Sequence, residues 1–451
     1  MDIAGTDRPS APAEELLPVP DGLVLAPFRA ERFDAARTPD LAAVTSPPYD
    51  VIDEDGVRRL EQADPHNVVR LILPREHDGL ADDATAGGAD ARTPTGNRYD
   101  RAAGTLAAWR SEGTLVRDPD PALYVYEETD GDHVQRGLLG AVGLVEPDAG
   151  VILPHENTMA GPVADRLALT RATGANLEPI FLVYDGGGAA SAAVAEASGR
   201  PPLLETETDD GIRHRLWRIE DGGALERIAA DLRPRRAVIA DGHHRYATYL
   251  QHQRDQHEAG AGSGPWDFGL ALLVDASAFG PQVHAIHRVV ASLPLVEAVA
   301  GAEKAFAVRQ LHGSTAAALE ALAAAGTSGA AFLVAGGDEV YLLTDPDPDA
   351  LDAALPTDRS AAWRGLDVTV AHLLLIRSLW AVADTEDVVD YRHDVDSALA
   401  AARASGGTAL LLNPTPVADV LAVAAAGERM PRKSTLFTPK PRTGLVLRPL
   451  S

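Results

Sequence analysis

The chain contains no cysteine and very little lysine. The absence of cysteine from 451 residues excludes disulfides, thiol nucleophiles, cysteine-ligated zinc and iron–sulfur clusters. Lysine occurs only at Lys304, Lys433 and Lys440, whereas arginine is abundant. Two of these lysines fall within one short segment, "GERMPRKSTLFTPKPRTG". This is either chance or a sign that both positions need a compact, strongly hydrated ammonium, which some phosphate contacts use.

Positive charge is scarce in the chain as a whole. Lysine and arginine number 40 against 66 acidic residues, so the formal net charge is −26. A surface of this kind repels nucleic acids and anionic membranes, and we expect neither as a partner. The N-terminal stretch lacks the apolar region of a signal peptide, and no apolar run is long enough to span a bilayer. We therefore expect a cytoplasmic protein, and the composition leaves a homodimer open.

The common nucleotide-binding loops are also missing, because neither G-x-G-x-x-G nor G-x-x-x-x-G-K-[ST] is present. Helical and strand patterns follow one another in irregular order, which predicts an α+β (mixed α/β) fold and not a doubly wound sheet. We expect a disordered tail over residues 1–22 and a core over 23–290, with a flexible insertion over 78–98. A C-terminal α/β region over 291–451 is expected to contribute a basic segment to the site.

Several segments carry clear local signals. Apolar periodicity predicts helices over residues 53–62, 164–173 and 296–325, the last of which is rich in alanine. Short apolar runs rich in β-branched residues predict strands over 68–73 and 180–184.

The first segment with chemical potential is "ADGHHRYAT", in which a strand leads through Gly242 into a helix. A helix N-terminus presents unpaired backbone N–H groups and the positive end of a dipole. Gly242 permits close approach of a ligand, and His243, His244 and Arg245 add donors, so the segment predicts a phosphate cradle. A metal site is a weaker interpretation, because adjacent histidines point in different directions on a helix. A third interpretation makes Asp241 a simple helix N-cap.

The second segment is "LPHENTMAGPVADRLAL", where a polar cluster directly follows a strand. Either Glu156 or His155 is placed to act as a general base towards a substrate hydroxyl, with Asn157 beside them. The alternative is a capped loop followed by a surface ion pair between Asp165 and Arg166.

The third segment is "SPPYDVID", in which two prolines stiffen a loop and position Tyr49 and Asp50. Asp50 is placed to bind a magnesium ion or a substrate amine. A plain turn with Asp53 as the cap of the following helix explains the same pattern.

The fourth segment, "GERMPRKSTLFTPKPRTG", is basic within a very acidic chain. A positive site on a negative molecule concentrates anionic ligands. The alternative is a solvated loop paired to local acids. The candidate phosphate-binding residues here are Arg432, Lys433, Ser434, Thr435 and Lys440, with Arg429 nearby.

Taken together, these segments resemble a prokaryotic family known as domain of unknown function 1015. The resemblance rests on the Pro-Pro-Tyr-Asp turn, "HNVVRLILP", "LPHENT", "NLEPIF", "ADGHHRYAT", "IHRVV", "LLNPT" and "GERMPRKST", in that order. It extends from about Val24 to Leu447, and departs from the family pattern in the insertion near residues 79–96 and in "MAGPVADR". The Asp-Gly-His-His-Arg turn is also similar to the phosphate-binding turn of the ParB/sulfiredoxin-like superfamily, which includes free serine kinases.

This resemblance implies a ParB/sulfiredoxin-like nucleotide-binding core and a phosphotransferase that uses ATP or ADP with Mg²⁺. The acceptor implied first is L-serine, a small hydroxylated metabolite. In this interpretation Glu156 is the base with His155 as its substitute, and Asp241 ligates Mg²⁺ or fixes a histidine. The nucleotide phosphates contact Gly242, His243, His244, Arg245 and the basic segment. The substrate contacts Tyr49, Asp50, Asn157, Asp165 and Arg166.

Three other functions fit the same residues. One is a non-catalytic nucleotide sensor that has the cradle but no acceptor pocket. Another is a hydrolase of phosphate esters. The last is a metal-dependent hydrolase, which requires His155, His243 or His244 to converge with a carboxylate on zinc.

Overall fold

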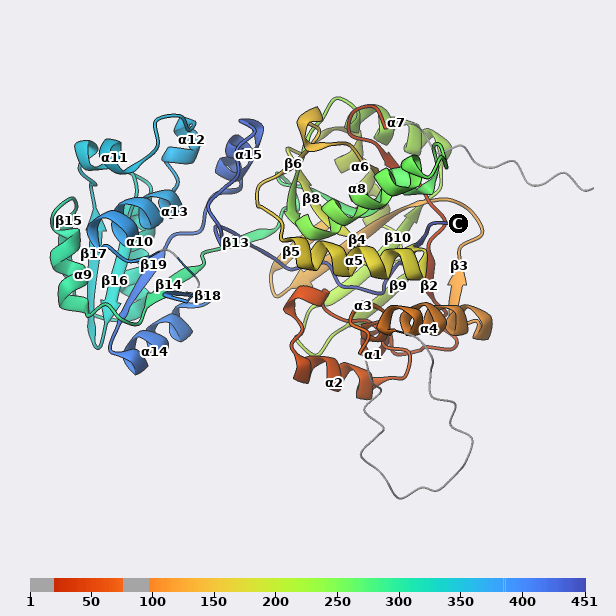
Figure 1. The fold of residues 1–451 in the computed structure, drawn as a ribbon. Coiled ribbons are helices and arrows are strands. Elements are labelled where there is room, and N and C mark those ends of the chain that lie inside the picture. The colour runs from red at the N-terminus through yellow and green to blue at the C-terminus, as the bar shows by residue number, and fades with distance from the viewer. Residues whose placement is uncertain (1–19, 76–96, 384, 386) are drawn as a thin grey trace, which may run out of the picture.

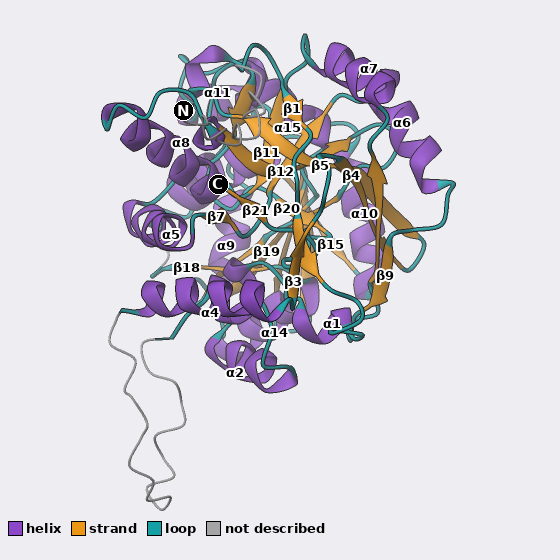
Figure 2. Cartoon of the chain, turned by 90° about the vertical axis from the view of Figure 1, so that its right-hand side faces the viewer, coloured by secondary structure: helices purple, strands orange, loops and turns teal. Residues whose placement is uncertain are grey.

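The computed structural model describes residues 20–75, 97–383, 385 and 387–451. The tail predicted over residues 1–22 and the insertion predicted over 78–98 lie almost wholly outside the described residues, although Arg98 already belongs to a helix. Figure 1 shows the chain as two lobes, each built around a sheet of its own. Figure 2 shows the strands inside and the helices around them.

The helical segments occur in both lobes. In chain order they are α1 (Leu41–Val44), η1 (Tyr49–Val51), α2 (Glu54–Ala63), α3 (Val69–Ile72), α4 (Arg98–Glu112), η2 (Pro147–Ala149), α5 (Ala160–Thr173), α6 (Gly188–Ser198), α7 (Gly222–Leu232), α8 (His243–Glu258), η3 (Pro265–Asp267), α9 (Leu295–Ala302), α10 (Thr315–Gly326), α11 (Pro348–Ala354), α12 (Ala361–Arg364), α13 (Asp367–Val370), the π-helical η4 (Ala371–Leu379), α14 (Val395–Ser405) and α15 (Val417–Ala425).

The strands are β1 (Leu25–Ala26), β2 (Glu31–Phe33), β3 (Leu115–Arg117), β4 (Leu123–Asp130), β5 (His133–Gly143), β6 (Ile152–Pro154), β7 (Ala175–Asn176), β8 (Ile180–Tyr184), β9 (Leu204–Glu207), β10 (Arg213–Ile219), β11 (Ala237–Asp241), β12 (Phe268–Asp275), β13 (Gln282–His284), β14 (His287–Val290), β15 (Ala307–Leu311), β16 (Phe332–Gly336), β17 (Glu339–Thr344), β18 (Val389–Arg392), β19 (Thr408–Leu412), β20 (Leu436–Thr438) and β21 (Arg448–Pro449).

The larger sheet counts nine strands among the described residues, in the order β6-β11-β8-β12-β5-β4-β10-β9 with β1 paired to β5. It is mixed, because β6 runs parallel to β11 and β8 parallel to β12, while the other pairs are antiparallel. The predicted mixed α and β class is therefore confirmed. The parallel pairing of β6 and β11 matters most for function, since both strands end at the same edge of the sheet.

The two faces of this sheet belong to different cores, as the alternation of side chains along a strand requires. On β8, Ile180 and Leu182 pack with residues of α6, α7 and α8. The intervening Phe181 faces the opposite side, where its ring meets Phe437 of β20 at 6.5 Å between centroids. The C-terminal segment therefore covers the face of the sheet that α8 does not.

The second sheet is antiparallel, in the order β15-β17-β16-β19-β14-β18. The chain leaves the first lobe through β13 and returns through β20, which pairs with β13. It ends in the first lobe, where β21 pairs with β7. The segment that follows the second sheet thus returns to the first lobe. There the Met430 amide donates to the His155 carbonyl at 2.8 Å, beside the edge where β6 and β11 end.

Three of the local predictions are confirmed. The strand predicted over residues 180–184 is β8, and the helix predicted over 53–62 is α2, capped by Asp53, whose Oδ1 accepts from the Gly56 amide at 2.7 Å. The helix predicted over 164–173 is α5, but it begins at Ala160. Pro162 belongs to its first turn, where a missing N–H costs nothing.

Two local predictions are wrong. Residues 68–73 form a short helix, α3, instead of a strand. Buried Asn67 starts it, because its Oδ1 accepts from the Val69 amide at 2.9 Å while its Nδ2 donates to the Ala43 carbonyl at 2.7 Å. The helix predicted over 296–325 is divided into α9, β15 and α10, since β15 pairs with β17. In both places tertiary contacts override local propensity.

None of the helices in the described part of the chain is long and apolar enough to cross a membrane.

Candidate functional site

The candidate site lies where β6 and β11 end side by side. Ile152 pairs with Ala237 and Pro154 with Ile239, so the residues that follow the two strands emerge together. Those residues are His155 and Glu156 after β6, and Asp241 at the end of β11. In sheets with parallel strands, ligands bind outside the carboxyl ends of the strands.

Helix α8 begins at this edge without a side-chain cap. Gly242 is its N-cap residue, with φ 91°, and no side chain accepts from the first turn. Within the described residues, the amides of His243, His244 and Arg245 have no acceptor. The interpretation of Asp241 as the N-cap is therefore wrong. The positive end of α8 is open to an anion.

The two histidines of the turn organise the loop after β6. His243 Nε2 accepts from the backbone amides of His155 at 3.2 Å and Glu156 at 3.3 Å, so its proton resides on Nδ1. His244 Nε2 accepts from the Met159 amide at 3.1 Å. Burial, together with the neighbouring positive groups, holds the pKa of His243 well below its usual value. Both rings therefore tie α8 to the loop that carries the candidate base.

Glu156 and His155 occupy different environments. The Glu156 side chain is 35% exposed, whereas that of His155 is 1% exposed. Burial and the negative charge of Asp241 raise the pKa of Glu156, and Lys433 and Lys440 act against this shift. Burial lowers the pKa of His155 to about 4, and its Nε2 lies 3.0 Å from Thr435 Oγ1. The Glu156 side chain is thus partly open to solvent, while neutral His155 belongs to the interior.

Lys440 joins three of the four predicted segments. Its ammonium pairs with Asp50 and lies 2.8 Å from Asp241 Oδ1. Burial disfavours the charged form of each group, but the ion pairs outweigh it, raising the pKa of Lys440 and lowering that of Asp50. Arg245 pairs with the second oxygen of Asp241. Lys440 of the basic segment is therefore paired with acids remote in sequence.

The guanidinium of Arg245 has one unused donor. The side chain is buried, with 4% of its surface exposed, and it also donates to the Pro179 carbonyl. Among the described residues its Nε–H has no acceptor, and it lies beside Gly242, where a Cβ would come within 3.0 Å of that nitrogen. A buried charged donor without a partner costs free energy, so this position calls for an anion.

Two arginine side chains lie near the ring of Tyr49. The Arg166 guanidinium lies 4.4 Å from the centre of the Tyr49 ring and that of Arg245 lies 6.0 Å away. Arg166 Nε donates to Asp165 at 2.9 Å. The predicted pair of Asp165 and Arg166 exists, but Arg166 is buried and the pair is not on the surface.

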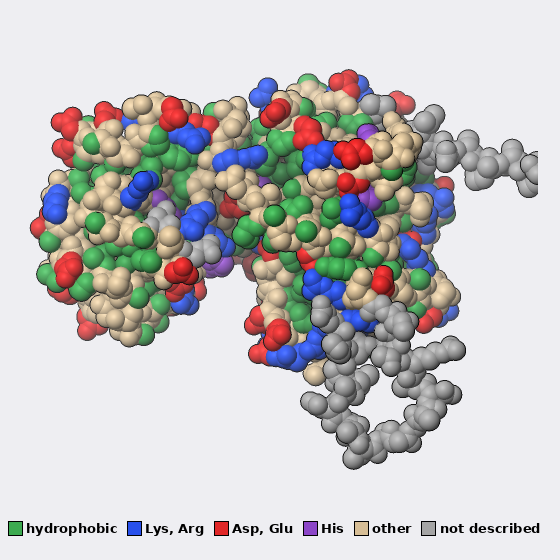
Figure 3. All heavy atoms as spheres, viewed as in Figure 1, with side chains coloured by type: hydrophobic (Ala, Val, Ile, Leu, Met, Phe, Trp, Pro, Cys, Tyr) green, Lys and Arg blue, Asp and Glu red, His purple; other side chains and the backbone are tan. Residues whose placement is uncertain are grey.

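The remaining predicted residues are divided between the two lobes. Lys433 is exposed and its charge acts on Glu156, while Asn157 is exposed in the loop after β6. Arg432 lies over the Tyr391 ring at 5.7 Å, and Ser434 is buried and donates to the Pro431 carbonyl. Figure 3 shows Lys, Arg and His side chains gathered where the two lobes meet.

One carboxylate near the site was not predicted from the sequence. Glu178 is buried, with 4% of its surface exposed, and accepts from the Tyr49 amide at 3.0 Å and from Thr443 Oγ1 at 3.3 Å. It therefore holds the Pro-Pro-Tyr-Asp turn and the C-terminal segment together. Its signal in the sequence was a lone acid just before the fully apolar β8.

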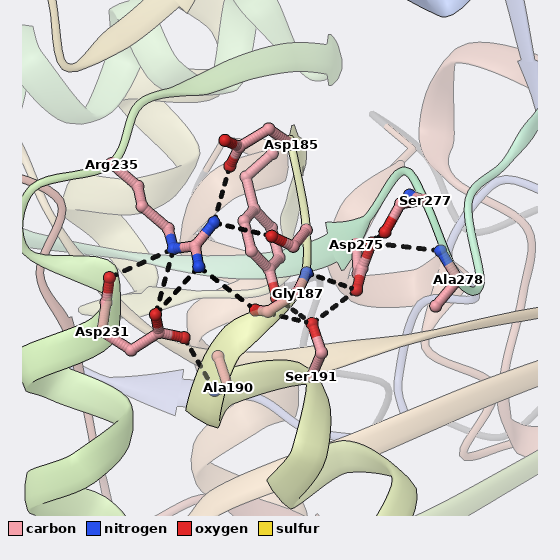
Figure 4. A network of polar contacts seen from close by, with 11 residues as sticks. Asp185, Gly187, Ala190, Ser191, Asp231, Arg235, Asp275, Ser277 and Ala278 are labelled. Atoms are coloured by element: carbon pink, nitrogen blue, oxygen red, sulfur yellow. Dashed lines mark hydrogen bonds and ion pairs between the residues drawn. The ribbon is translucent and has the colours of Figure 1, made fainter.

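Another strand, glycine turn and helix occurs where β8 leads into α6, and it is already filled by the protein. The Asp275 carboxylate accepts from the Gly187 amide at 3.0 Å, from the Ser277 amide at 2.7 Å and from Ser191 Oγ (Figure 4). These bonds outweigh burial and lower the pKa of Asp275 to about 2. The turn binds an internal anion, which leaves the α8 turn as the open one of the two.

No group of three or more His, Asp or Glu side chains in the described residues is arranged to hold a metal ion. A catalytic zinc site needs three protein ligands, so the zinc hydrolase hypothesis has no ligand set in that part of the chain. Magnesium bound together with phosphates requires only one or two carboxylates. Asp241 and Asp50, which converge on the Lys440 ammonium, have the oxygen donors for such an ion.

The sequence profile of a family described as "Protein of unknown function (DUF1015)" matches residues 25–369. The chain belongs to the DUF1015 family. The resemblance predicted from the motifs is thereby confirmed. No curated protein matches the sequence.

Among solved structures, the chain is similar to a free serine kinase determined with ADP and with AMP, at 15% identity and a TM-score of 0.34, over 67% of this chain and 90% of that one. A conserved hypothetical protein from Pyrococcus furiosus is similar at 14% identity and a TM-score of 0.31, over 65% and 89% of the two chains. SbnI from Staphylococcus aureus, with a C-terminal truncation, is similar at 11% identity and 0.33, over 69% and 87%. Similarities of this size concern the fold alone.

Proposed function

We propose that the protein is a phosphotransferase that moves a phosphoryl group from ATP or ADP to the hydroxyl of a small metabolite, with L-serine as the first acceptor to test. The observation that carries the proposal is the open N-terminus of α8. Among the described residues, three amides and the Nε–H of buried Arg245 lack acceptors there. Glu156 Oε2 lies 4.0 Å from His243 Nδ1, and the charge of Lys433 acts on Glu156. Phosphoryl transfer needs donors around the phosphates and a base for the acceptor.

The phosphates would bind mainly through the backbone. Gly242 allows their close approach, and the amides of His243, His244 and Arg245 donate to them. The Nε of Arg245 and the ammonium of Lys433 add charge. Asp241 would hold Mg²⁺, which neutralises phosphate charge when bound.

Glu156 would act as the general base. The acceptor oxygen attacks the terminal phosphorus, its proton passes to the Glu156 carboxylate, and the bond from phosphorus to the bridging oxygen of the nucleotide breaks. A carboxylate whose pKa is raised towards neutral pH is a stronger base than an ordinary one. Asn157 and Asp50 are the neighbouring polar groups that would bind the acceptor.

A phosphorus NMR time course tests the proposal. The sample holds the full chain, Mg²⁺, ATP or ADP, and one candidate acceptor at a time, beginning with L-serine. We expect a phosphomonoester signal that grows in step with nucleotide loss and requires one acceptor. Nucleotide loss without this signal identifies a hydrolase instead. Nucleotide binding without any turnover identifies a sensor, and either outcome contradicts the proposal.

Glu156→Gln tests the assignment of the base. We expect turnover to fall by at least about 100-fold, the usual contribution of a general base, while nucleotide affinity stays within about twofold. Glu146→Gln is the matched control, because this carboxylate is 57% exposed and its ion pair in the described part of the chain is with Arg254. Full activity of the Glu156 variant would show that another group takes the proton.

A further inference from the structure

A cleft of about 680 Å³ opens beside the candidate site, on the far side of Tyr49. Its walls are η1 and the start of α2, the residues after α3, and the N-terminus of α5. Ile52, Val57, Leu73 and Pro162 supply apolar surface to it, and Tyr49 supplies an aromatic ring. Nothing in the phosphate cradle or the base requires a cleft of this kind.

The cleft borders the phosphate cradle at two places. The first is Tyr49, which lines the cleft and lies 6.0 Å from the Arg245 guanidinium. The second is the α5 N-terminus: Gly161 lines the cleft, while the Met159 amide just before it donates to His244 Nε2. A ligand in the cleft therefore reaches the open end of α8 along one wall.

The dimensions and lining of the cleft suit a nucleoside. Pockets for ligands of that size measure about 300–1,000 Å³ and combine apolar or aromatic walls with a few polar groups. A planar base matches the surface of Tyr49, Ile52 and Leu73. At the rim, the carboxylate of Glu54 is 91% exposed, and its oxygens can accept hydrogen bonds from ribose hydroxyls. An acceptor the size of serine would leave most of this volume empty.

We propose that this cleft is the nucleoside site of the enzyme, with the base between Tyr49 and Leu73, the ribose at Glu54, and the phosphates extending to the α8 N-terminus. This inference rests on the proposed function. It assigns Tyr49, Asp165 and Arg166, predicted from the sequence to contact the substrate, to the donor nucleotide and not to the acceptor.

Calorimetric titration of the full chain with two probes, ADP and inorganic pyrophosphate, both with Mg²⁺, separates the cleft from the cradle. We expect ADP to bind at least about tenfold more tightly than pyrophosphate, because only ADP gains the apolar contacts of the cleft. Adenosine alone should compete with ADP but leave pyrophosphate binding unchanged.

Replacing Ile52 and Leu73 together by alanine tests the site by mutation. ADP affinity should fall about tenfold or more, and pyrophosphate affinity should change less than about twofold. Val51→Ala is the control, since Val51 is 54% exposed and adjacent to Ile52 but does not line the cleft. A melting curve establishes that each variant is folded. The adenosine competition uses the unmodified chain, so it tests the site even if a variant fails to fold.

The possible results distinguish the two proposals. If ADP and pyrophosphate bind equally well and adenosine does not compete, the nucleoside site is overturned while the phosphate cradle stands. If the double variant weakens both probes equally, the cleft has no separate role. If neither probe binds, the proposed function fails, and the nucleoside site fails with it.

Discussion

Replacing Lys440 by methionine tests whether three of the four polar segments are held together as described. Methionine keeps the length and apolar stem of the side chain and removes only the ammonium. The Lys440 side chain is 17% exposed, and its partners Asp241 and Asp50 are 15% and 33% exposed. Without the ammonium, two carboxylates would face each other. Arg245 would stay paired with Asp241, and its charge would still act on Asp50.

The expected loss of stability lies between two known limits. Removing one partner of a fully buried ion pair costs about 3–5 kcal/mol. Breaking an exposed pair costs about 0–1 kcal/mol. Lys440, Asp241 and Asp50 are mostly buried but partly exposed to solvent, and Arg245 remains in the variant. We therefore expect the free energy of unfolding to fall by about 2 kcal/mol. For a chain of this length the unfolding entropy is about 1 kcal/mol/K, so the melting temperature should fall by about 2 °C.

Thermal melting of Lys440→Met beside Lys304→Met measures this effect. Lys304 is exposed in the other lobe, so its replacement should leave the melting temperature unchanged. The Lys440 effect should persist in about 0.5 M NaCl, because a shielded pair is screened little. It should disappear as the pH falls through the lowered pKa of Asp50, since a carboxylate with a depressed pKa stabilises the fold only while it is ionised. Equal melting of the two variants at pH 7 would refute the reasoning.

Two further predictions concern a buried acid and the phosphate turn. Burial raises the pKa of Glu128 to about 7, so unfolding releases its proton between about pH 4.5 and 7, and stability is lost as the pH rises through that range. In denaturant titrations, the stability of Glu128→Gln relative to the natural chain should therefore increase by about 3 kcal/mol across this window. The exposed control Asp130→Asn should show no such change with pH. If the stability difference of Glu128→Gln also stays constant with pH, Glu128 is not the buried acid described. Gly242→Ala should cost about 1–2 kcal/mol of stability because of its φ of 91°, and should weaken pyrophosphate binding by about tenfold or more because the new Cβ crowds Arg245 Nε. Gly260, at the other end of α8, has a similar φ of 81° and no atom near the position of an added Cβ, so Gly260→Ala should reduce stability without changing pyrophosphate affinity. Unchanged pyrophosphate affinity in Gly242→Ala would show that the α8 turn does not bind phosphate.

Local signals predicted the parts of the fold that are governed by nearest neighbours. Asp53 caps α2 because its side chain reaches an amide three residues ahead. The strand at residues 180–184 forms because all five side chains are apolar and buried on both faces. The same reasoning failed at residues 68–73 and 296–325, where the competing choice depends on distant partners. Asn67 binds a carbonyl 24 residues away, and β15 needs β17 to exist.

The division between local and distant information is the same at the candidate site. The sequence indicated the glycine turn into α8 and the polar loop after β6, because each lies within one short segment. It left Asp241 as a helix cap, a Mg²⁺ ligand or a residue that fixes a histidine, and it did not indicate an ion pair. That pair depends on Lys440, which lies 199 positions further along the chain and returns through β20.

By itself, the sequence determined the family, the mixed class of the fold, the exclusion of cysteine chemistry and the identity of the polar segments. Composition and short-range geometry are sufficient for these conclusions. Only the tertiary structure decided that Glu156 is partly exposed while His155 is buried, that Arg245 Nε has no acceptor among the described residues, and that Tyr49 lies between the Arg245 guanidinium and a cleft of about 680 Å³. Exposure, the partners of a charged group and the shape of a cleft arise from contacts between segments hundreds of residues apart, and no local pattern records which of those segments will meet.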